Sequence, residues 1–168
     1  KGKILKIGSG VSTIPAGKFN SEWDNWDGPV GIDFSEATSL TTIEKRAFYH
    51  CKQLEGDLDL SGATSLTTIG EGAFGYCLHL KKLTLPDSIE TIEDRAFVNC
   101  KKLEGELTIP SSLETIGEKA FYFCKQLEGL NLSGATSLET IGYYAFYNCT
   151  GFEGDLDLSG ATSLTTIG

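Results

Sequence analysis

The chain has 168 residues, of which 40% are hydrophobic, and its formal net charge is −9. Nucleic acids and anionic membrane surfaces are bound mainly through clustered Lys and Arg, and this acidic chain has no basic run, so both classes of partner are excluded. No stretch approaches the ~18 consecutive apolar residues of a membrane span, so we expect no membrane insertion.

The phrase EGDLDLSGATSLTTIG occupies residues 55–70 and returns unchanged at residues 153–168. Weaker copies of the unit accompany them, and five Ala-Phe pairs mark the units at successive spacings of 26, 23, 24 and 25 residues. The pairs are Ala47-Phe48, Ala73-Phe74, Ala96-Phe97, Ala120-Phe121 and Ala145-Phe146. A unit of this length cannot bury a core of its own, whereas stacked copies can, so the repeat predicts a solenoid.

In chain order, each unit begins with a short strand whose residues alternate between apolar and polar. The predicted strands are 31–34, 57–60, 82–85, 106–109, 129–132 and 155–158. After a short or a long connection comes a second extended piece, typically Thr-Thr-Ile, and then one helical turn around the Ala-Phe pair. The N-terminal residues follow the same spacing, with Trp23 and Trp26 near the positions that hold cysteine and leucine elsewhere. Each unit makes a full revolution, so the strands should be parallel.

All five cysteines fall at one register, four residues after the alanine of each pair. They are Cys51, Cys77, Cys100, Cys124 and Cys149. A zinc site would need paired ligands of the CxxC kind, which the chain lacks. A disulfide between successive units remains an alternative. The shared register favours a third interpretation, in which each cysteine is a small buried residue whose thiol donates to a nearby carbonyl, beside a spine of phenylalanines.

The repeated pattern AFxxCxxLxxLxLPxSLxxIxxx resembles the BspA-like leucine-rich repeats, also called the Treponema pallidum type. The resemblance implies a leucine-rich-repeat solenoid of about six stacked turns of 23–26 residues. A parallel β-sheet would form one face, with short second strands and single helical turns on the other. It also implies a non-enzymatic protein-binding module without cofactors, acting as an extracellular or cell-surface adhesion domain. The implied partner is host extracellular matrix or another surface protein.

Three other functions are alternatives to adhesion. A passive structural spacer in a longer surface protein is the main alternative. Catalysis needs unlike residues that converge in a cleft, whereas this chain repeats like residues in rows, so we predict no catalytic, cofactor-binding or metal-binding residues. Ice binding is a remote third function, suggested by one threonine in every unit, but Glu90, Glu114 and Glu139 interrupt the neighbouring column.

One candidate binding face follows the outward positions of the predicted strands, which form polar columns with carboxylates at both ends. We call this set the polar strip; it comprises Asp33, Asp57, Asp59, Lys82, Thr84, Glu106, Thr108, Asn131, Asp155 and Asp157. It is either a recognition face for a basic partner or a divalent cation, or an ordinary solvated face. Asp33 and Asp59 are expected to be direct neighbours on adjacent strands.

A second candidate face lies on the side of the Ala-Phe segments, where aromatic residues replace the charged or small residues of other units. We call it the aromatic patch; it comprises Tyr122, Phe123, Tyr143, Tyr144 and Tyr147. Contact with another protein and contact with the next unit both explain this replacement.

The chain reads as a single solenoid domain over residues 1–168. Its last phrase stops before the next Ala-Phe pair, so Leu156, Leu158, Leu164 and Ile167 would have no following unit to cover them. We therefore expect a fragment of a longer protein, truncated mid-repeat, whose open apolar edge favours self-association.

Overall fold

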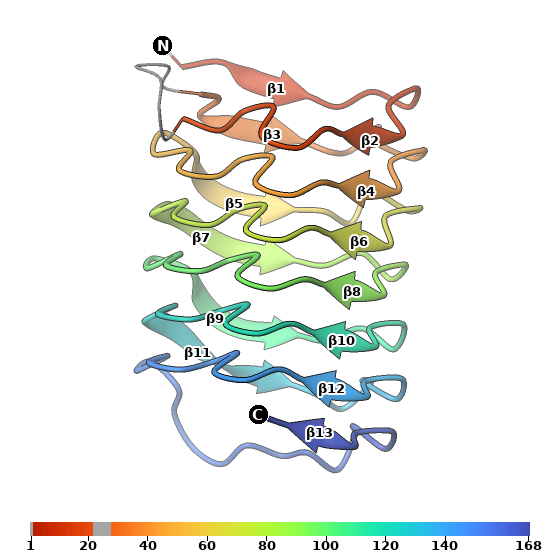
Figure 1. The fold of residues 1–168 in the computed structure, drawn as a ribbon, viewed down its shortest axis with the longest axis vertical. Helices are drawn as coiled ribbons and strands as arrows, with labels where there is room; N and C mark the ends of the chain where they lie inside the picture. The colour runs from red at the N-terminus through yellow and green to blue at the C-terminus, as the bar shows by residue number, and fades with distance from the viewer. Residues whose placement is uncertain (1, 22–27) are drawn as a thin grey trace.

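The computed structural model describes residues 2–21 and 28–168, and Trp23 and Trp26 lie outside this part. The chain winds into a solenoid whose coils stack along the long axis, with the two termini toward opposite ends of the stack (Figure 1). Every described coil carries a two-residue strand on a second face, and all but the last carry one strand on a first face. Between the two-residue strand and the next first-face strand lies a series of tight turns, which contains the Ala-Phe pair in the coils that have one.

The second face is a continuous parallel sheet of seven strands. These are β2 (Thr13–Ile14), β4 (Thr42–Ile43), β6 (Thr68–Ile69), β8 (Thr91–Ile92), β10 (Thr115–Ile116), β12 (Thr140–Ile141) and β13 (Thr166–Ile167). In every pair threonine lies beside threonine and isoleucine beside isoleucine, so the predicted second strands are confirmed.

The strands of the first face are parallel, as predicted, but they do not form one sheet. They are β1 (Ile4–Lys6), β3 (Gly31–Asp33), β5 (Glu55–Asp59), β7 (His79–Thr84), β9 (Glu104–Thr108) and β11 (Gln126–Asn131). Within the described residues they pair as β1-β3, β5-β7 and β9-β11.

Each break in this sheet falls before a coil whose link to the strand is one residue longer. The extra residue is a glycine with positive φ, Gly56 at 79° and Gly105 at 80°, a conformation that other residues adopt only at a cost. Gly56 pairs with Leu80, and Gly105 pairs with Leu127. The register of each pair shifts at this point, between Gly56 and Leu58 in β5-β7 and between Leu127 and Gly129 in β9-β11, so each ladder is irregular beside the extra glycine.

In the core, the same type of side chain recurs at the same position of successive coils, which forms columns along the stack. Six phenylalanine rings stack at centroid separations of 5.0 to 5.4 Å with interplanar angles of 9° or less; they are Phe19, Phe48, Phe74, Phe97, Phe121 and Phe146. Pairs of stacked rings contribute about 0.5–1.5 kcal/mol beyond their burial. The alanine of each pair is also buried in the described coils, where two coils approach closely. The predicted spine is confirmed.

The expected helical turns were wrong, because the described residues contain no helix. Around Ala47, the amides of Arg46 and Phe48 donate to carbonyls of the next coil, at 2.8 and 2.7 Å. The amides of Ala47 and Tyr49 close turns three residues back within their own coil. Alternate amides therefore stabilise the stack, which a helix would forbid, and the alternation places Arg46 in the left-handed region at φ 55°.

The strand predicted at residues 155–158 is also absent. The identical letters at 57–60 belong to β5, which pairs with β7. Only the second-face part of the last copy is a strand, β13, and it pairs with β12.

Candidate protein-docking surfaces

The polar strip is only partly assembled by the structure. Asp59 lies beside Thr84, and Thr108 lies beside Asn131, as the predicted column requires. Asp33 pairs with Lys6, however, and no ladder joins β3 to β5 in the described residues, so Asp33 and Asp59 are not direct strand partners as expected. They instead border one hollow of about 370 Å³ with Asp57.

Four members of the polar strip have a structural task in the loop that follows the strand. Each accepts a hydrogen bond at Oδ1 from the backbone amide of the serine two residues later, at 2.9 to 3.1 Å; they are Asp33, Asp59, Asn131 and Asp157. This side-chain turn opens the long connection. A sequence signal for this turn exists. In the long connections Asp or Asn stands two residues before Ser, whereas in the short connections after β7 and β9 Thr stands two residues before Pro.

In two members of the strip these hydrogen bonds also lower the pKa of the accepting carboxyl group. The bonds from Ser35, together with the charge of Lys6, lower the pKa of Asp33. The bonds from Ser159 lower the pKa of Asp157. Asp155 and Asp157 lie in the last coil, where the first-face strand is absent, so the strip has no regular continuation at that end.

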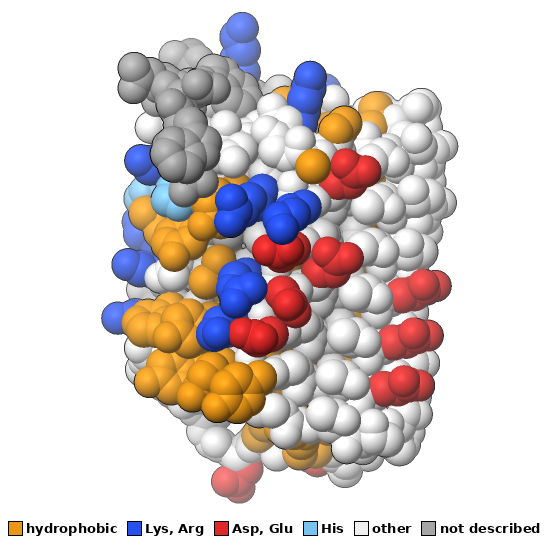
Figure 2. Space-filling view, viewed as in Figure 1, with side chains coloured by type: hydrophobic (Ala, Val, Ile, Leu, Met, Phe, Trp, Pro, Cys, Tyr) orange, Lys and Arg blue, Asp and Glu red, His pale blue; other side chains and the backbone are white. Residues whose placement is uncertain are grey.

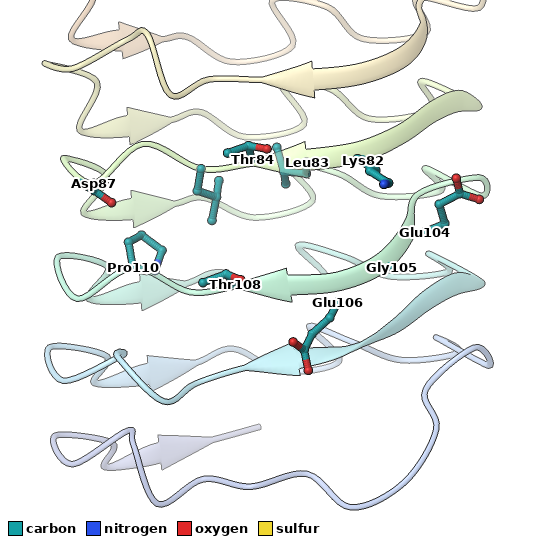
Figure 3. Close-up of a pocket in the computed structure, with 10 residues that line it drawn as sticks. Lys82, Leu83, Thr84, Asp87, Glu104, Gly105, Glu106, Thr108 and Pro110 are labelled. Carbon is teal, nitrogen blue, oxygen red and sulfur yellow. The ribbon is translucent and has the colours of Figure 1, made fainter.

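A hollow of about 480 Å³ opens on the first face between β7 and β9, where the sheet is broken. It contains Lys82, Thr84, Glu106 and Thr108 of the polar strip. Figure 3 shows Glu104 and Asp87 at opposite ends of this hollow, so its polar groups are spread along the strands instead of meeting at one point. In the part of the chain that the structure describes, no three His, Cys, Asp or Glu side chains are placed to hold a metal ion.

The aromatic patch is a connected surface of rings. Tyr122 stacks on Tyr147 at 5.2 Å, and Tyr144 meets Tyr147 edge-on at 5.1 Å. Tyr143 lies 4.0 Å from Tyr144, and Phe123 lies 4.6 Å from Tyr122, as ring centroids. The structure therefore brings together all five predicted residues from two successive coils.

The rings of this patch remain open to solvent despite their contacts. Tyr143 is 57% exposed, Tyr147 50% and Tyr144 40%. Figure 2 shows hydrophobic side chains gathered beside the basic ones along one side of the stack. A hydrogen bond with Tyr143 raises the pKa of Tyr144, so this phenol is neutral at pH 7. The rings contact one another within the solenoid and are also exposed to solvent, so the patch can serve either purpose.

A second hollow, which the sequence did not reveal, adjoins the aromatic patch. We call this space of about 390 Å³ the turn-face hollow. Its lining includes three cations and three tyrosines: Arg46, Arg95, Lys119, Tyr49, Tyr76 and Tyr122. Tyr122 belongs to both surfaces, and the Lys119 ammonium lies 5.8 Å from the Tyr144 ring, so the two are continuous.

The turn-face hollow exists because one coil lacks a side chain that its neighbours carry. Gly72 lines the hollow at the position of Arg46 and Arg95. Gly75, at the position of Tyr49, is covered by the Tyr49 ring, because a Cβ atom there would lie 2.8 Å from that ring. The signal available in the sequence was Gly72 in a row of large residues.

Ion pairs border the hollow on one side. Glu71 accepts from Lys45 at 2.7 Å, and Glu118 accepts from Lys119 at 2.6 Å and from Arg95 at 3.4 Å. The two cations lower the pKa of Glu118, mainly through the Lys119 bond. Arg46 has no carboxylate partner among the described residues, and its guanidinium lies 4.8 Å from the Tyr49 ring.

The cysteines lie in the core, as predicted, and each thiol is free. Each Sγ donates to the carbonyl of the phenylalanine one coil earlier; Cys77, for example, donates to Phe48 at 3.2 Å. Burial raises the pKa of Cys100 and of Cys149 to about 12. A thiol with such a pKa is not a nucleophile at neutral pH, because the thiolate is the reactive form.

These features can be compared with known proteins. The family model for the BspA type leucine rich repeat region matches six copies across residues 31–153. The chain belongs to this family. Members of the BspA-type family are protein-interaction or structural modules and are generally non-enzymatic scaffolds. Among curated proteins, no sequence matches the chain.

Solved structures of other bacterial leucine-rich-repeat proteins are similar. A leucine-rich repeat protein from Eubacterium ventriosum superposes with a TM-score of 0.77 at 26% identity, covering 96% of this chain and 41% of that one. The T. pallidum leucine-rich repeat protein superposes with a TM-score of 0.58 at 28% identity, covering 89% of this chain and 60% of that one. The BspA-type chain thus spans 41% to 60% of the length of these relatives.

Proteins of the BspA-type family are typically exposed on the surface of bacteria or secreted. In residues 2–21 and 28–168 no helix is long and apolar enough to span a membrane.

Proposed function

We propose that this chain is a non-enzymatic protein-binding module of a bacterial surface or secreted protein, and that it acts in adhesion through the aromatic patch. The observation that carries the proposal is the exposure of Tyr143, Tyr144 and Tyr147 at 57%, 40% and 50%. Large exposed rings that contact one another are a surface that a protein partner can cover, and tyrosine is enriched among the residues that dominate such interfaces.

Comparison of equivalent positions in successive coils supports the choice of the aromatic patch. Where the patch has Tyr143, other coils have Glu71 and Glu118, and where it has Tyr144, another coil has Lys119. The core and the turns accept either residue type, so folding alone does not require the rings. The ring contacts fix the side chains before binding, which reduces the entropy that an interface must lose.

The polar strip supports the proposal less well than the aromatic patch. Its carboxylates Asp33, Asp59 and Asp157 are engaged by backbone amides of the following loop. This observation favours the alternative of a solvated face on a passive spacer, because these acidic residues already have a role in stabilising the turn that begins each long connection. A spacer would show no saturable binding at all.

The proposal is tested with a triple variant that restores the residues of sibling coils: Tyr143→Glu, Tyr144→Lys and Tyr147→Val. Each replacement is taken from the equivalent position of another coil, so the fold should be kept. The matched control is Asp59→Asn on the polar strip. Wild type and variants are passed over immobilised extracellular-matrix proteins and surface proteins of co-resident bacteria.

We expect saturable binding by the wild type to at least one of these partners. The triple variant should weaken that binding by at least about tenfold, and Asp59→Asn should leave it unchanged. Saturable binding that is lost with Asp59→Asn and kept by the triple variant would move the docking face to the polar strip. No saturable binding to any partner would leave the spacer as the better account.

A further inference from the structure

The turn-face hollow has a chemistry that the aromatic patch lacks. Its lining contains three cations, Arg46, Arg95 and Lys119, but only one carboxylate, Glu71. The chain as a whole carries a net charge of −9. Positive groups are thus gathered beside exposed rings on one side of an acidic molecule, as the blue and orange surfaces in Figure 2 show.

We propose that the turn-face hollow binds an extended acidic segment of the partner protein, in which acidic residues alternate with apolar ones. The inference rests on the proposed function, because it names the chemistry of the segment that such a partner would insert beside the aromatic patch. It concerns residues outside that patch except for Tyr122, so the two proposals can be tested apart.

The acidic character of the segment follows from the partners of the cations. Arg46 has no carboxylate partner among the described residues and is exposed. Arg95 reaches Glu118 only at 3.4 Å, and Glu118 is already held by Lys119 at 2.6 Å. The one carboxylate in the lining, Glu71, is neutralised by Lys45 at 2.7 Å. Arg46 and Arg95 can therefore each receive a carboxylate, in the paired geometry that guanidinium groups favour.

The extended shape of the segment follows from how coils stack. Arg46, Arg95 and Lys119 share one position of the repeat, before the alanine of the Ala-Phe pair, and Tyr49 and Tyr122 share the position after the phenylalanine. Hydrogen bonds between coils hold the Ala-Phe segments side by side, so the cations lie in one row along the stack, interrupted by Gly72. Tyr49 and Tyr122 lie at the two ends of the neighbouring row, with Gly75 and Val98 between them. An extended peptide directs successive side chains to opposite sides. Acidic residues would meet the cations, and apolar residues would meet the rings.

The depth of the site comes from Gly72, which leaves backbone where neighbouring coils have the side chains of Arg46 and Arg95. Gly72 is buried, and a Cβ on it would lie 3.5 Å from the Tyr49 ring. Gly72 has φ 61°, and its siblings Arg95 and Lys119 adopt 57° and 56° with full side chains. A larger residue at position 72 would therefore fill the hollow without requiring a different backbone.

An acidic polysaccharide is the competing occupant, and the border of the hollow disfavours it. Glu93, Asp94 and Glu118 lie next to the cations in the chain. A polymer with a charge on every unit would place some of its charges against these carboxylates. A peptide with an acid at every second residue avoids them, because its other side chains are apolar.

The test uses a fluorescein-labelled peptide, Glu-Leu-Glu-Leu-Glu-Leu-Glu, and fluorescence anisotropy at low salt. Hexaglutamate, Lys-Leu-Lys-Leu-Lys-Leu-Lys and polygalacturonate serve as comparison ligands. Arg46→Glu reverses the unpaired cation, and Gly72→Tyr fills the hollow with the residue that the sibling Tyr144 provides. The control Lys81→Glu makes the same change in net charge on strand β7 of the other face.

We expect saturable binding of the Glu-Leu peptide, weakened at least about tenfold by Arg46→Glu and by Gly72→Tyr and unchanged by Lys81→Glu. Raising the ionic strength to about 0.3 M should weaken it severalfold, because the cations are exposed. The Lys-Leu peptide should not bind, and hexaglutamate should bind more weakly because it lacks groups for the rings.

Absence of Glu-Leu binding would overturn the proposal, as would equal weakening by Lys81→Glu. Binding of polygalacturonate alone would assign the hollow to a polysaccharide instead. The proposed function fails separately, since it predicts loss of the protein partner in the triple variant of the aromatic patch. If the triple variant loses the partner while Arg46→Glu and Gly72→Tyr have no effect, the aromatic patch remains the docking face and the hollow is not part of it.

Discussion

Residues 55–70 and 153–168 have the same sixteen letters in two surroundings. The first copy has a coil on each side, forms β5 and β6, and buries its apolar side chains: Leu58 is 2% exposed and Ile69 is fully buried. The second copy has a coil on one side only, forms β13 without a first-face strand, and leaves Leu156 at 50% and Ile167 at 60%. Local sequence is identical, so the difference comes from the neighbouring coil.

The comparison also shows which contacts depend on which neighbour. In both copies the amides of the Thr-Thr pair donate to the coil before, as Thr67 does to Thr41 and Thr165 to Glu139. Leu60 donates to Thr84 of the coil after, whereas the amide of Leu158 has no backbone acceptor among the described residues. The second face of a coil therefore bonds to its predecessor. On the first face, the start of each copy also bonds to its predecessor, as Glu55 does to Val30 and Glu153 to Glu128, and the end of the first copy bonds to its successor through Leu60.

The largest effect on stability should come from truncating the equivalent leucine of the two copies, with a high cost in the first copy and a low cost in the second. Leu58→Ala leaves a cavity in a fully packed coil and should lower the free energy of unfolding by about 2–5 kcal/mol. Leu156→Ala removes a half-exposed side chain and should cost less than about 1 kcal/mol. Urea unfolding of the two variants measures both values. Equal costs would mean that the last coil is as well packed as the interior one.

Adding a following coil should make the second copy resemble the first. A copy of residues 71–96 appended after Gly168 reproduces the sequence that follows the first copy, and it should raise the melting temperature by several degrees. Leu156→Ala in this longer chain should then cost about as much as Leu58→Ala. The control extension has serine at the apolar positions of the added coil and should change neither value.

An unchanged melting temperature with the apolar extension would show that residues 153–168 gain nothing from a successor. It would also contradict the claim that the first-face strand of this copy needs a following coil in order to form.

Much of the fold follows from the repeat alone. The spine of phenylalanines, the register of the cysteines and the Thr-Ile strands are equal positions of stacked units, and equal positions must pack on one another. The turns around Ala-Phe were mistaken for helix, because the acceptors of Arg46 and Phe48 lie in the next coil, outside any local pattern. Left-handed backbone at Arg46 and Phe123 also lacks the usual signal of glycine or asparagine.

The candidate site was less predictable, since it depends on departures from the repeat. The aromatic patch was visible because Tyr143 and Tyr144 break charged rows. The turn-face hollow was not, because its cause is the absence of a side chain at Gly72. The role of Asp59 in its loop could have been read from the serine two residues later.

Thiol labelling should distinguish a cysteine of an interior coil from one beside the last coil by their difference in solvent access. Cys100 and Cys149 share a pKa of about 12, but Cys100 is fully buried and Cys149 is 9% exposed beside the last coil. With a thiol reagent at pH 8, both should react much more slowly in the native protein than after denaturation, and Cys149 should react before Cys100. Fast native labelling of several cysteines would refute the core placement.

The same thiols predict how stability depends on pH. In the unfolded chain a cysteine ionises near pH ~8.5, whereas Cys100 and Cys149 keep their protons up to about 12 when folded. A raised pKa in the folded state stabilises the fold fully below the unfolded value, and this contribution is lost as pH rises through the folded one. The free energy of unfolding should therefore fall between about pH 8.5 and 12. Replacing Cys100 with alanine should flatten this dependence.

The smallest effect should come from Asp→Asn at the equivalent positions 59 and 157. Asparagine keeps the Oδ1 that accepts from Ser61 or Ser159, so Asp59→Asn should change the free energy of unfolding by less than about 0.5 kcal/mol. Asp157→Asn should remove part of the loss of stability at acid pH, because the lowered pKa of Asp157 stabilises the fold only above that pKa. Urea unfolding at pH 7 and pH 3 measures both changes.

Amide hydrogen exchange tests the role of the neighbouring coil most directly. The two copies share their letters, so corresponding amides inside them have the same intrinsic exchange rate, and any difference reports structure. We predict that Thr67 and Thr165 are both protected, that Leu60 is strongly protected by Thr84, and that Leu158 exchanges close to the intrinsic rate. Equal protection of Leu60 and Leu158 would contradict the account, since the sixteen residues would then form their first-face structure without a following coil.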